Sequence, residues 1–242
     1  MTLGPLAIHI PAYCAESTLS ELVGRIPSDV WELSPRVLVV DDGSKDGTAR
    51  LAAKLASQHP HFDVHSFPEN RGYGAATAYG LAWARDLGAV ASICLHADGQ
   101  YPPEQIPDLL AALEKGCDLV QGSRHLHGTA LRGGMPFYKW MGGKGLVAVE
   151  RFGLGLPLTD FHSGFLGFGP RALAALPLEK MSQSFDFDLE AIARTHAAGL
   201  TIGEIGIPTR YADEVSHLRS IPYGLRCLRV VWRFRMGAFR TR

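Results

Sequence analysis

Cysteine is scarce in this 242-residue chain, and its four copies are far apart in the sequence: Cys14, Cys94, Cys117 and Cys227. They form no CxxC pair and no other short spacing typical of a zinc site. The sequence therefore predicts buried, unpaired thiols in a reducing cytosol.

The chain also lacks a net charge, because 24 lysines and arginines balance 24 aspartates and glutamates. A neutral chain has no overall field that attracts nucleic acid, so no nucleic-acid partner is expected. No run of about 18 uninterrupted apolar residues is present, which argues against a transmembrane helix, and the N-terminus lacks the basic region of a signal peptide. These absences predict a cytoplasmic protein, or one held at the cytoplasmic surface of a membrane.

Several motifs of other enzyme classes are missing. The sequence has no GxxxxGK[ST] phosphate-binding loop and no GxSxG nucleophile elbow. His125 and His127 could ligate a transition metal, but no third ligand stands at a suitable spacing. A P-loop nucleotidase, a serine hydrolase and a metal centre on this histidine pair are therefore all disfavoured.

Hydrophobic residues make up 46% of the chain, which is sufficient for one sizeable core in a single domain. Short apolar runs predict strands at 6–10, 36–40, 62–66, 91–95 and 118–121. Apolar residues at helical spacing predict helices at 17–26, 47–57, 74–87 and 104–114. This alternation is typical of an α/β domain with a mostly parallel central sheet and helices on both faces.

After residue 133 the alternation weakens. The sequence predicts helices at 136–152, 185–197 and 221–236, a strand at 201–207 and a glycine-rich connection at 160–165.

Polar motifs stand where the predicted strands end. Ligands of open α/β sheets bind outside the carboxyl ends of the strands, so we expect these motifs to converge on one edge. They are Pro11-Ala12-Tyr13, Asp41-Asp42-Gly43-Ser44, Glu69-Asn70-Arg71-Gly72, His96-Ala97-Asp98-Gly99-Gln100 and Gly122-Ser123-Arg124.

Two of these motifs carry carboxylates with a clear chemical use. Asp42 could accept hydrogen bonds from the imide N–H of a base or from ribose hydroxyls, and an ordinary Asp-Gly turn with a helix cap at Asp46 is the alternative. Asp98 with the Gln100 carbonyl suits Mg²⁺ or Mn²⁺, which take few protein oxygens and share their other sites with water and phosphates. A turn that closes onto the next helix is the alternative for Asp98.

Four cations lie in or just after the strand-end loops: Arg71, Arg124, Lys139 and Lys144. A leaving diphosphate, if one binds at this edge, would need such cations to neutralise its charge. Each cation alone could be a solvated surface charge, and their shared position favours diphosphate binding, most of all for Arg124.

Taken together, the motifs resemble glycosyltransferase family 2, especially its dolichyl-phosphate mannose synthases and other polyprenyl-phosphate glycosyltransferases. The resemblance runs from residue 6 to residue 220. It is carried by Ile10-Pro11-Ala12-Tyr13 with Glu16, Val40-Asp41-Asp42-Gly43-Ser44 with Asp46-Gly47-Thr48, Asn70-Arg71-Gly72-Tyr73-Gly74, Asp98-Gly99-Gln100 with Pro102-Pro103-Glu104, Gly122-Ser123-Arg124, Ser163-Gly164-Phe165 and Phe185-Asp186-Phe187-Asp188-Leu189-Glu190.

This resemblance implies one GT-A (Rossmann-like) catalytic domain at 1–220, followed by a basic amphipathic helix and tail at 221–242. The nucleotide-binding half would be 1–124 and the acceptor half 125–220. The nucleotide would be bound by Pro11, Tyr13, Glu16, Asp42 and Arg71. A divalent metal, Mg²⁺ or Mn²⁺, would be held by Asp98 and Gln100. The diphosphate or an acceptor phosphate would meet Arg124, Lys139 and Ser163, and the implied catalytic residues are Asp98, Arg124 and Glu190.

The chain departs from the family pattern in three places. His96 stands where the usual D-x-D-x-Q motif has its first carboxylate, so His96 either ligates the metal or orients Asp98. The E-S-K of many relatives is replaced by Val215-Ser216-His217, and the paired C-terminal membrane helices of many relatives are missing.

The implied reaction moves a hexose from a nucleotide diphosphate sugar to an acceptor with inversion, and the implied acceptor is a polyprenyl phosphate. An anionic phosphate acceptor needs no general base, whereas a saccharide or other hydroxyl acceptor does; the available carboxylates are Asp160, Asp186, Asp188 and Glu190. Two readings of other classes stay open at this point: a nucleotidyltransferase and a non-catalytic nucleotide-sugar binding module.

The segment 221–236 carries an apolar stripe at helical spacing: Ile221, Leu225, Leu228, Trp232 and Met236. Three arginines border the stripe: Arg226, Arg229 and Arg233. Such a helix could lie in an anionic membrane surface with the arginines on lipid phosphates, or the stripe could pack onto the catalytic domain.

Overall fold

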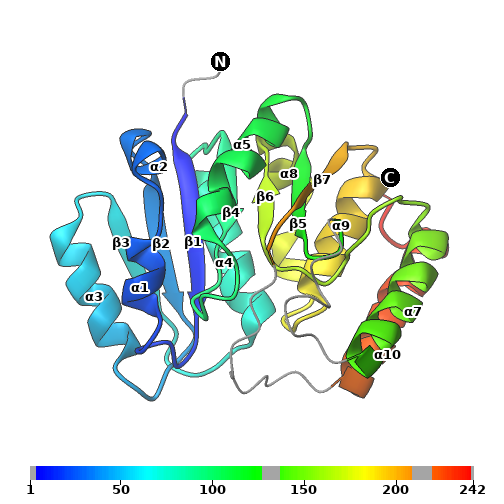
Figure 1. Ribbon diagram of the computed structural model, residues 1–242, viewed down its shortest axis with the longest axis horizontal. Coiled ribbons are helices and arrows are strands. Elements are labelled where there is room, and N and C mark those ends of the chain that lie inside the picture. The colour runs from blue at the N-terminus through cyan, green and yellow to red at the C-terminus, as the bar shows by residue number, and fades with distance from the viewer. Residues whose placement is uncertain (1–3, 127–136, 209–219, 241–242) are drawn as a thin grey trace.

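A seven-stranded sheet organises the protein, and its strands follow the order β3-β2-β1-β4-β6-β5-β7 (Figure 1). The computed structural model describes residues 4–126, 137–208 and 220–240. The strands are β1 (Leu6–Ala12), β2 (Arg36–Asp41), β3 (Phe62–Ser66), β4 (Ala91–Cys94), β5 (Leu119–Ser123), β6 (Leu166–Phe168) and β7 (Ile202–Gly206).

Helices connect these strands. They are α1 (Leu19–Gly24), α2 (Ser28–Glu32), α3 (Thr48–Gln58), α4 (Tyr73–Asp86), α5 (Ile106–Glu114), α7 (Phe137–Leu154), α8 (Pro170–Ala175), α9 (Phe187–Ala197) and α10 (Ser220–Arg235). Two short 3-10 turns, η1 (Pro103–Gln105) and η2 (Leu178–Lys180), precede α5 and α9. The predicted α/β class with a mostly parallel sheet is therefore confirmed.

Strand β6 is the exception to the parallel sheet. It lies between β4 and β5 and runs antiparallel to both, whereas β5 and β7 are parallel to each other, like β1, β2, β3 and β4. Because β6 is reversed, its beginning lies at the edge where its neighbours end. The residues just before it, 160–165, are thereby delivered to the carboxyl edge of the sheet.

The sequence analysis did not predict β6, α2 or α8. β6 has only three residues, Leu166–Phe168, and a glycine at its centre, so it carries no alternating pattern long enough to indicate a strand. Pairing on both sides, with β4 and β5, compensates for its low intrinsic preference.

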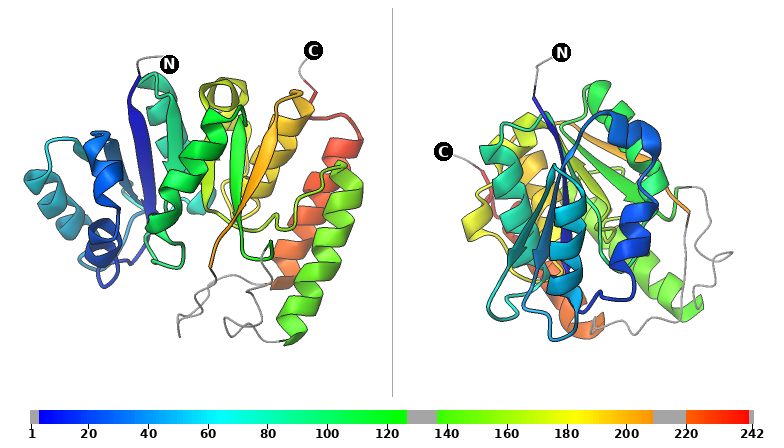
Figure 2. Two further views of the ribbon diagram at one scale, coloured as in Figure 1. Left: turned by 45° about the horizontal axis from the view of Figure 1, so that its top comes forward. Right: turned by 90° about the vertical axis from the view of Figure 1, so that its left-hand side faces the viewer.

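Helices cover both faces of the sheet (Figure 2). On one face Ile8 and Ile10 of β1 pack in a cluster with Leu19 and Leu22 of α1 and with residues of α3 and α5. On the other face α4, α8 and α9 share a second cluster, to which α10 contributes Cys227, Val230 and Val231. The strands are thus buried from both sides, as expected for a parallel sheet.

Helices α7 and α10 lie side by side beyond α9 and run in the same direction (Figure 1). Gly153 of α7 faces Val231 of α10, and a Cβ at position 153 would collide with the valine side chain. The assignment of residues 1–220 to a catalytic domain and 221–242 to an appendage stays a prediction, and the inner side of α10 belongs to the main core.

Helix α4 approaches β1 closely at Gly80, where a Cβ would lie 2.6 Å from the Cβ of His9. We expect Gly80→Ala to lower the free energy of unfolding by about 1–3 kcal/mol through overpacking, although alanine is the better helix former. Gly24→Ala is the matched control, because a Cβ at Gly24 meets nothing within 4 Å. Urea unfolding of both variants measures the difference, and a Gly80→Ala protein as stable as the control would contradict the tight α4–β1 contact.

Candidate functional site

The polar motifs gather at the carboxyl edge of the sheet, which is the lower edge in Figure 1. β1 ends at Ala12, β2 at Asp41 and β5 at Ser123, and the reversed β6 begins at Leu166 on the same side. The strand-end motifs therefore meet at one edge of the sheet, as the sequence predicted. The segment before β6 joins them there.

Asp42 organises the loop that leads into α4. Its Oδ1 accepts a hydrogen bond from the backbone N–H of Arg71 (2.7 Å), and its Oδ2 accepts one from Gly72 (2.9 Å). The residue is 3% exposed. Burial raises the pKa of Asp42, and the two amide hydrogen bonds oppose this shift. Asp42 thus fixes the loop before α4, and its contact with a nucleotide stays a prediction.

The other predicted nucleotide residues differ in accessibility. Pro11 is buried within β1, whereas Tyr13 is 43% exposed and offers its ring at the same edge. Glu16 accepts a hydrogen bond from the Gly47 N–H (2.8 Å) at the start of α3 and pairs with Arg50 (3.2 Å). Arg71 is exposed, and its guanidinium lies 4.8 Å from the centre of the Phe67 ring.

Asp98 lies in the turn between β4 and η1. Its Oδ1 accepts a hydrogen bond from the Gln100 N–H (3.0 Å), which closes the turn around Gly99. Gly99 has a φ of +71°, a left-handed conformation that suits glycine. Asp98 and Gln100 are both partly exposed, so their side chains are accessible to a ligand.

His96 belongs to a hydrogen-bonded chain that the sequence did not reveal. The Tyr73 hydroxyl lies 2.9 Å from Nε2 of His96 and 2.9 Å from Oδ1 of Asp188. Burial lowers the pKa of His96, although the nearby Asp98 opposes this effect, so the imidazole is neutral near pH 7. His96 therefore does not replace the negative charge of the family's first carboxylate.

Arg124 follows β5 and is held by the segment before β6. Its Nε lies 3.4 Å from Oδ2 of the buried Asp160, and its Nη2 donates to the His162 carbonyl (3.3 Å). Burial alone would raise the pKa of Asp160, but the Arg124 guanidinium and His162 outweigh it and hold that pKa below its usual range. This ion pair orients Arg124, whose side chain keeps 21% of its surface exposed.

Ser163 and Lys139 complete the predicted phosphate-binding set. Ser163 is fully buried; its carbonyl accepts a hydrogen bond from Gln121 (3.1 Å), and its hydroxyl has no hydrogen-bond partner among the described residues. Lys139 lies in the first turn of α7, and its side chain falls outside the described part of the structure. His127 and Val215-Ser216-His217 also lie outside the described residues.

Comparison with known proteins identifies the family of this chain. The sequence model described as glycosyl transferase family 2 matches residues 7–172, more than half of the chain. The chain belongs to glycosyltransferase family 2. Polyprenol monophosphomannose synthase of Mycolicibacterium smegmatis is 31% identical over 202 residues, which cover 83% of this chain and 75% of that protein. Undecaprenyl-phosphate mannosyltransferase of Micrococcus luteus is 33% identical over 199 residues, which cover 82% of this chain and 80% of that protein.

Solved structures agree on the fold. Glucosyl-3-phosphoglycerate synthase of Mycobacterium tuberculosis, solved with Mn²⁺ and UDP-glucose, aligns with a TM-score of 0.70 and 21% identity over 97% of this chain and 80% of that chain. At this identity the similarity supports the GT-A architecture alone. The protein is a glycosyltransferase, and neither the nucleotidyltransferase nor the non-catalytic reading is retained.

Glu190 is one of the three residues that the family resemblance implies to be catalytic, and this assignment stays a prediction. In this glycosyltransferase its carboxylate is 2% exposed. It pairs with Arg194 (2.7 Å) and Arg233 (3.5 Å) and accepts a hydrogen bond from the Ser182 N–H (3.0 Å). These contacts join α9 to α10 and to the segment that follows η2.

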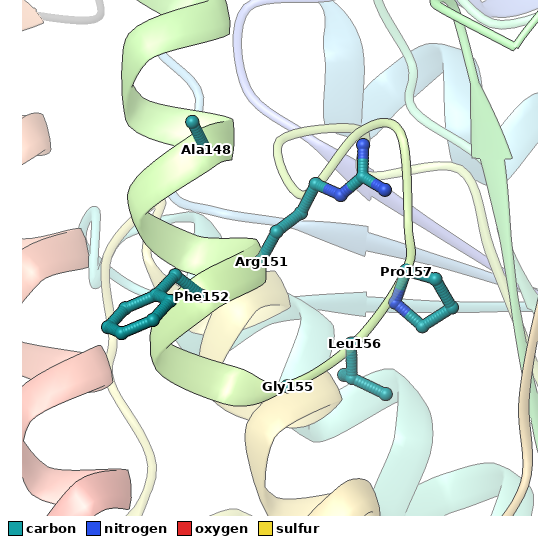
Figure 3. Close-up of a pocket in the computed structure, with 6 residues that line it drawn as sticks. All are labelled: Ala148, Arg151, Phe152, Gly155, Leu156 and Pro157. Carbon is teal, nitrogen blue, oxygen red and sulfur yellow. The ribbon is translucent and has the colours of Figure 1, made fainter.

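A shallow hollow of about 500 Å³ lies at the end of α7, away from the strand-end motifs (Figure 3). It is lined by Ala148, Arg151, Phe152, Gly155, Leu156 and Pro157. None of the family motifs of this glycosyltransferase reaches it, so we do not assign the donor to it.

The buried Asp188, which accepts a hydrogen bond from Tyr73, predicts how the stability of the protein depends on pH. Burial raises the pKa of Asp188 to about 7, even though the Tyr73 hydrogen bond favours the charged form. The folded state then holds a proton that the unfolded state releases, so stability falls as pH rises between about 4 and about 7, by at most about 1.4 kcal/mol per pH unit. We expect Asp188→Asn to lack this decline, so that the difference in unfolding free energy between wild type and variant changes with pH in urea unfolding at pH 4.5, 6 and 7.5. A constant difference at all three pH values would contradict the raised pKa.

Proposed function

We propose that this glycosyltransferase moves a hexose from a nucleotide diphosphate sugar to a polyprenyl phosphate, with inversion at the anomeric carbon. Two relatives that align over more than four fifths of this chain are named for polyprenol or undecaprenyl phosphate and for mannose transfer. These names support a lipid phosphate as the acceptor class and a hexose as the transferred sugar.

The burial and the close neighbours of the four candidate general bases favour a phosphate acceptor over a hydroxyl acceptor. A hydroxyl acceptor needs a carboxylate that can take its proton, and the sequence offers four: Asp160, Asp186, Asp188 and Glu190. Each of them is at most 7% exposed, and each lies within 4 Å of an arginine or a tyrosine hydroxyl. A phosphate oxygen is already anionic and attacks without a base, so a lipid phosphate fits this site better than a hydroxyl.

The proposed step forms a bond between the acceptor phosphate oxygen and the anomeric carbon of the donor. The bond from that carbon to the nucleotide diphosphate breaks on the opposite face, and its electron pair leaves with the diphosphate. Arg124, oriented by Asp160 and the His162 carbonyl, would stabilise the charge that develops there. Tyr13 and the Asp42-supported loop, with Glu16 and Arg71 beside them, would hold the nucleotide.

The residues at the tip of β4 fit a hard divalent cation. Oδ1 of Asp98 is engaged by the Gln100 N–H, and Oδ2 makes no hydrogen bond within the described part of the chain. Asp98 and the Gln100 side chain would hold Mg²⁺ or Mn²⁺, whose positive charge would stabilise the leaving diphosphate. Nε2 of His96 is engaged with Tyr73, which supports a positioning role for His96 rather than metal ligation through that atom.

The outer side of α10 supports contact with a membrane, where a polyprenyl phosphate resides. We call the predicted stripe the outer apolar face; its five residues are 42–79% exposed: Ile221, Leu225, Leu228, Trp232 and Met236. They point away from the core, and Phe152 of α7 is 82% exposed. No described helix has the length and apolar content needed to cross a membrane, so we propose that α10 lies in the membrane surface.

The arginines that border the outer apolar face divide into two groups. Arg226 lies 3.8 Å from Asp186 and Arg233 lies 3.5 Å from Glu190, so both turn toward α9. Arg229 and Arg235 are exposed, and the Arg235 guanidinium lies 6.0 Å from the Phe152 ring. Arg229 and Arg235 are therefore the arginines of α10 that we propose for anionic headgroups.

The proposed reaction is tested by supplying nucleotide diphosphate hexoses with and without undecaprenyl phosphate in detergent. We expect a lipid-linked hexose and free nucleoside diphosphate in the presence of the lipid. We expect Asp98→Asn to reduce the rate at least about a hundredfold while the circular dichroism spectrum is retained, because only transition-state charge stabilisation is removed. Transfer to a sugar hydroxyl instead of the lipid, or more than a tenth of the activity left in Asp98→Asn, would contradict the acceptor or the metal assignment respectively.

The membrane contact is tested by cosedimentation with liposomes that contain anionic phospholipid. We expect the double variant Leu225→Ser, Trp232→Ser to bind at least about tenfold more weakly than the wild type, because two exposed apolar side chains no longer enter the bilayer surface. Leu33→Ser is the matched control, since Leu33 is 58% exposed but lies beside α2 on the other side of the molecule. Wild-type protein that remains in the supernatant, or equal loss in the control, would overturn the proposed role of the outer apolar face.

A further inference from the structure

Three metal-binding residue types meet between α7, α10 and the segment before β6. They are Glu150 of α7, His162, and Cys227 of α10, and their ligand atoms all lie within 4.8 Å of one another. Glu150 and Cys227 are fully buried, and the His162 side chain is 15% exposed. The cluster is separate from the Asp98 turn and contains none of the residues that the family motifs assign to the donor.

Three polar atoms of this cluster lack a hydrogen-bond partner among the described residues. Neither carboxylate oxygen of the buried Glu150 makes a hydrogen bond among the described residues, and neither does Nε2 of His162. Oε2 of Glu150 and Nε2 of His162 are 3.1 Å apart but not aligned for a hydrogen bond. A buried carboxylate with no aligned hydrogen bond among the described residues is destabilising, so the site favours a ligand that supplies positive charge beside Glu150 and His162.

We propose that Glu150, His162 and Cys227 bind a zinc ion. A thiolate, an imidazole nitrogen and a carboxylate oxygen are the ligands that zinc takes in proteins, whereas Mg²⁺ and Mn²⁺ prefer oxygen alone. Tetrahedral zinc places its ligand atoms about 3.5 Å apart, so the widest gap in the cluster closes by about 1 Å on binding. With a neutral imidazole, the carboxylate and thiolate balance the charge of the ion, and the buried site is neutral.

Tyr223 contacts the other ring nitrogen of His162 and fixes the orientation of the imidazole. Its hydroxyl lies 2.8 Å from Nδ1 of His162, which leaves Nε2 directed at Glu150. Histidines that bind metals commonly donate their second N–H to such a partner, which sets the tautomer and the ring orientation. The Tyr223 ring also packs edge-on against the imidazole at a centroid distance of 5.5 Å.

The site would connect the outer helices to the catalytic edge. The His162 carbonyl accepts a hydrogen bond from Arg124 (3.3 Å), and the His162 backbone N–H donates one to Asp160 (2.9 Å). Zinc at Nε2 would restrain this segment together with α7 and α10, so Arg124 and the outer apolar face would be held in one rigid unit. Zinc binding itself does not depend on the proposed acceptor.

The full-length protein tests this proposal after removal of metal with a chelator. We expect one Co²⁺ per chain to bind with a thiolate-to-cobalt charge-transfer band, and zinc to displace it and to raise the thermal unfolding midpoint. Cys227→Ala should abolish the band, and Glu150→Gln should weaken cobalt binding at least tenfold. Both variants are checked by circular dichroism.

Two controls separate this site from other ligands. Cys117→Ala should keep the band, because Cys117 lies outside the cluster, and Asp98→Asn should keep it, because that residue serves the proposed catalytic cation. A wild-type protein without the band, or a band that survives Cys227→Ala, would overturn the zinc site whether or not the variants fold well. Loss of the band in Asp98→Asn would overturn it as well, while leaving the test of lipid-phosphate transfer unaffected.

Discussion

The reversed strand β6 is the constraint on which the arrangement of the site depends. Its pairing with β4 and β5 turns the preceding segment toward the carboxyl edge, between the Asp98 turn and Arg124. Asp160 can therefore form its buried ion pair with Arg124, and the His162 carbonyl can accept from the same guanidinium. A parallel strand in this position would place its own end at the edge and would carry this segment to the opposite side of the sheet.

Carboxylates at the edge serve the architecture as well as the proposed chemistry. Asp42 binds two backbone amides of the loop before α4, Glu16 binds the amide of Gly47 before α3, and Asp98 binds the amide of Gln100. Hydrogen bonds from backbone amides to a charged carboxylate are among the stronger ones in proteins, so the loops are ordered without a ligand. A preorganised loop loses less entropy when it binds a nucleotide, which favours donor affinity.

Helix α10 has two apolar sides with different partners. Cys227, Val230 and Val231 are buried in the main core, while the outer apolar face is exposed on the opposite side. The inner contacts are tight enough to require Gly153 on α7. A helix held so firmly from within presents its outer side in a fixed orientation, which suits a surface that meets a membrane beside a catalytic edge.

The sequence by itself determined the α/β class, the order of most strands and helices, and the family, because apolar periodicity and strand-end motifs are local patterns. It also located the stripe on α10, although periodicity could not say whether that stripe faces the core or the solvent. Only the tertiary structure decided that the stripe is exposed, that Glu190 is enclosed by Arg194 and Arg233, and that β6 runs backwards. The same holds for the cluster of Glu150, His162 and Cys227, whose members stand far apart in the chain and show no ligand spacing. Such contacts form when elements that are separate in the sequence pack together, so local sequence patterns cannot predict them.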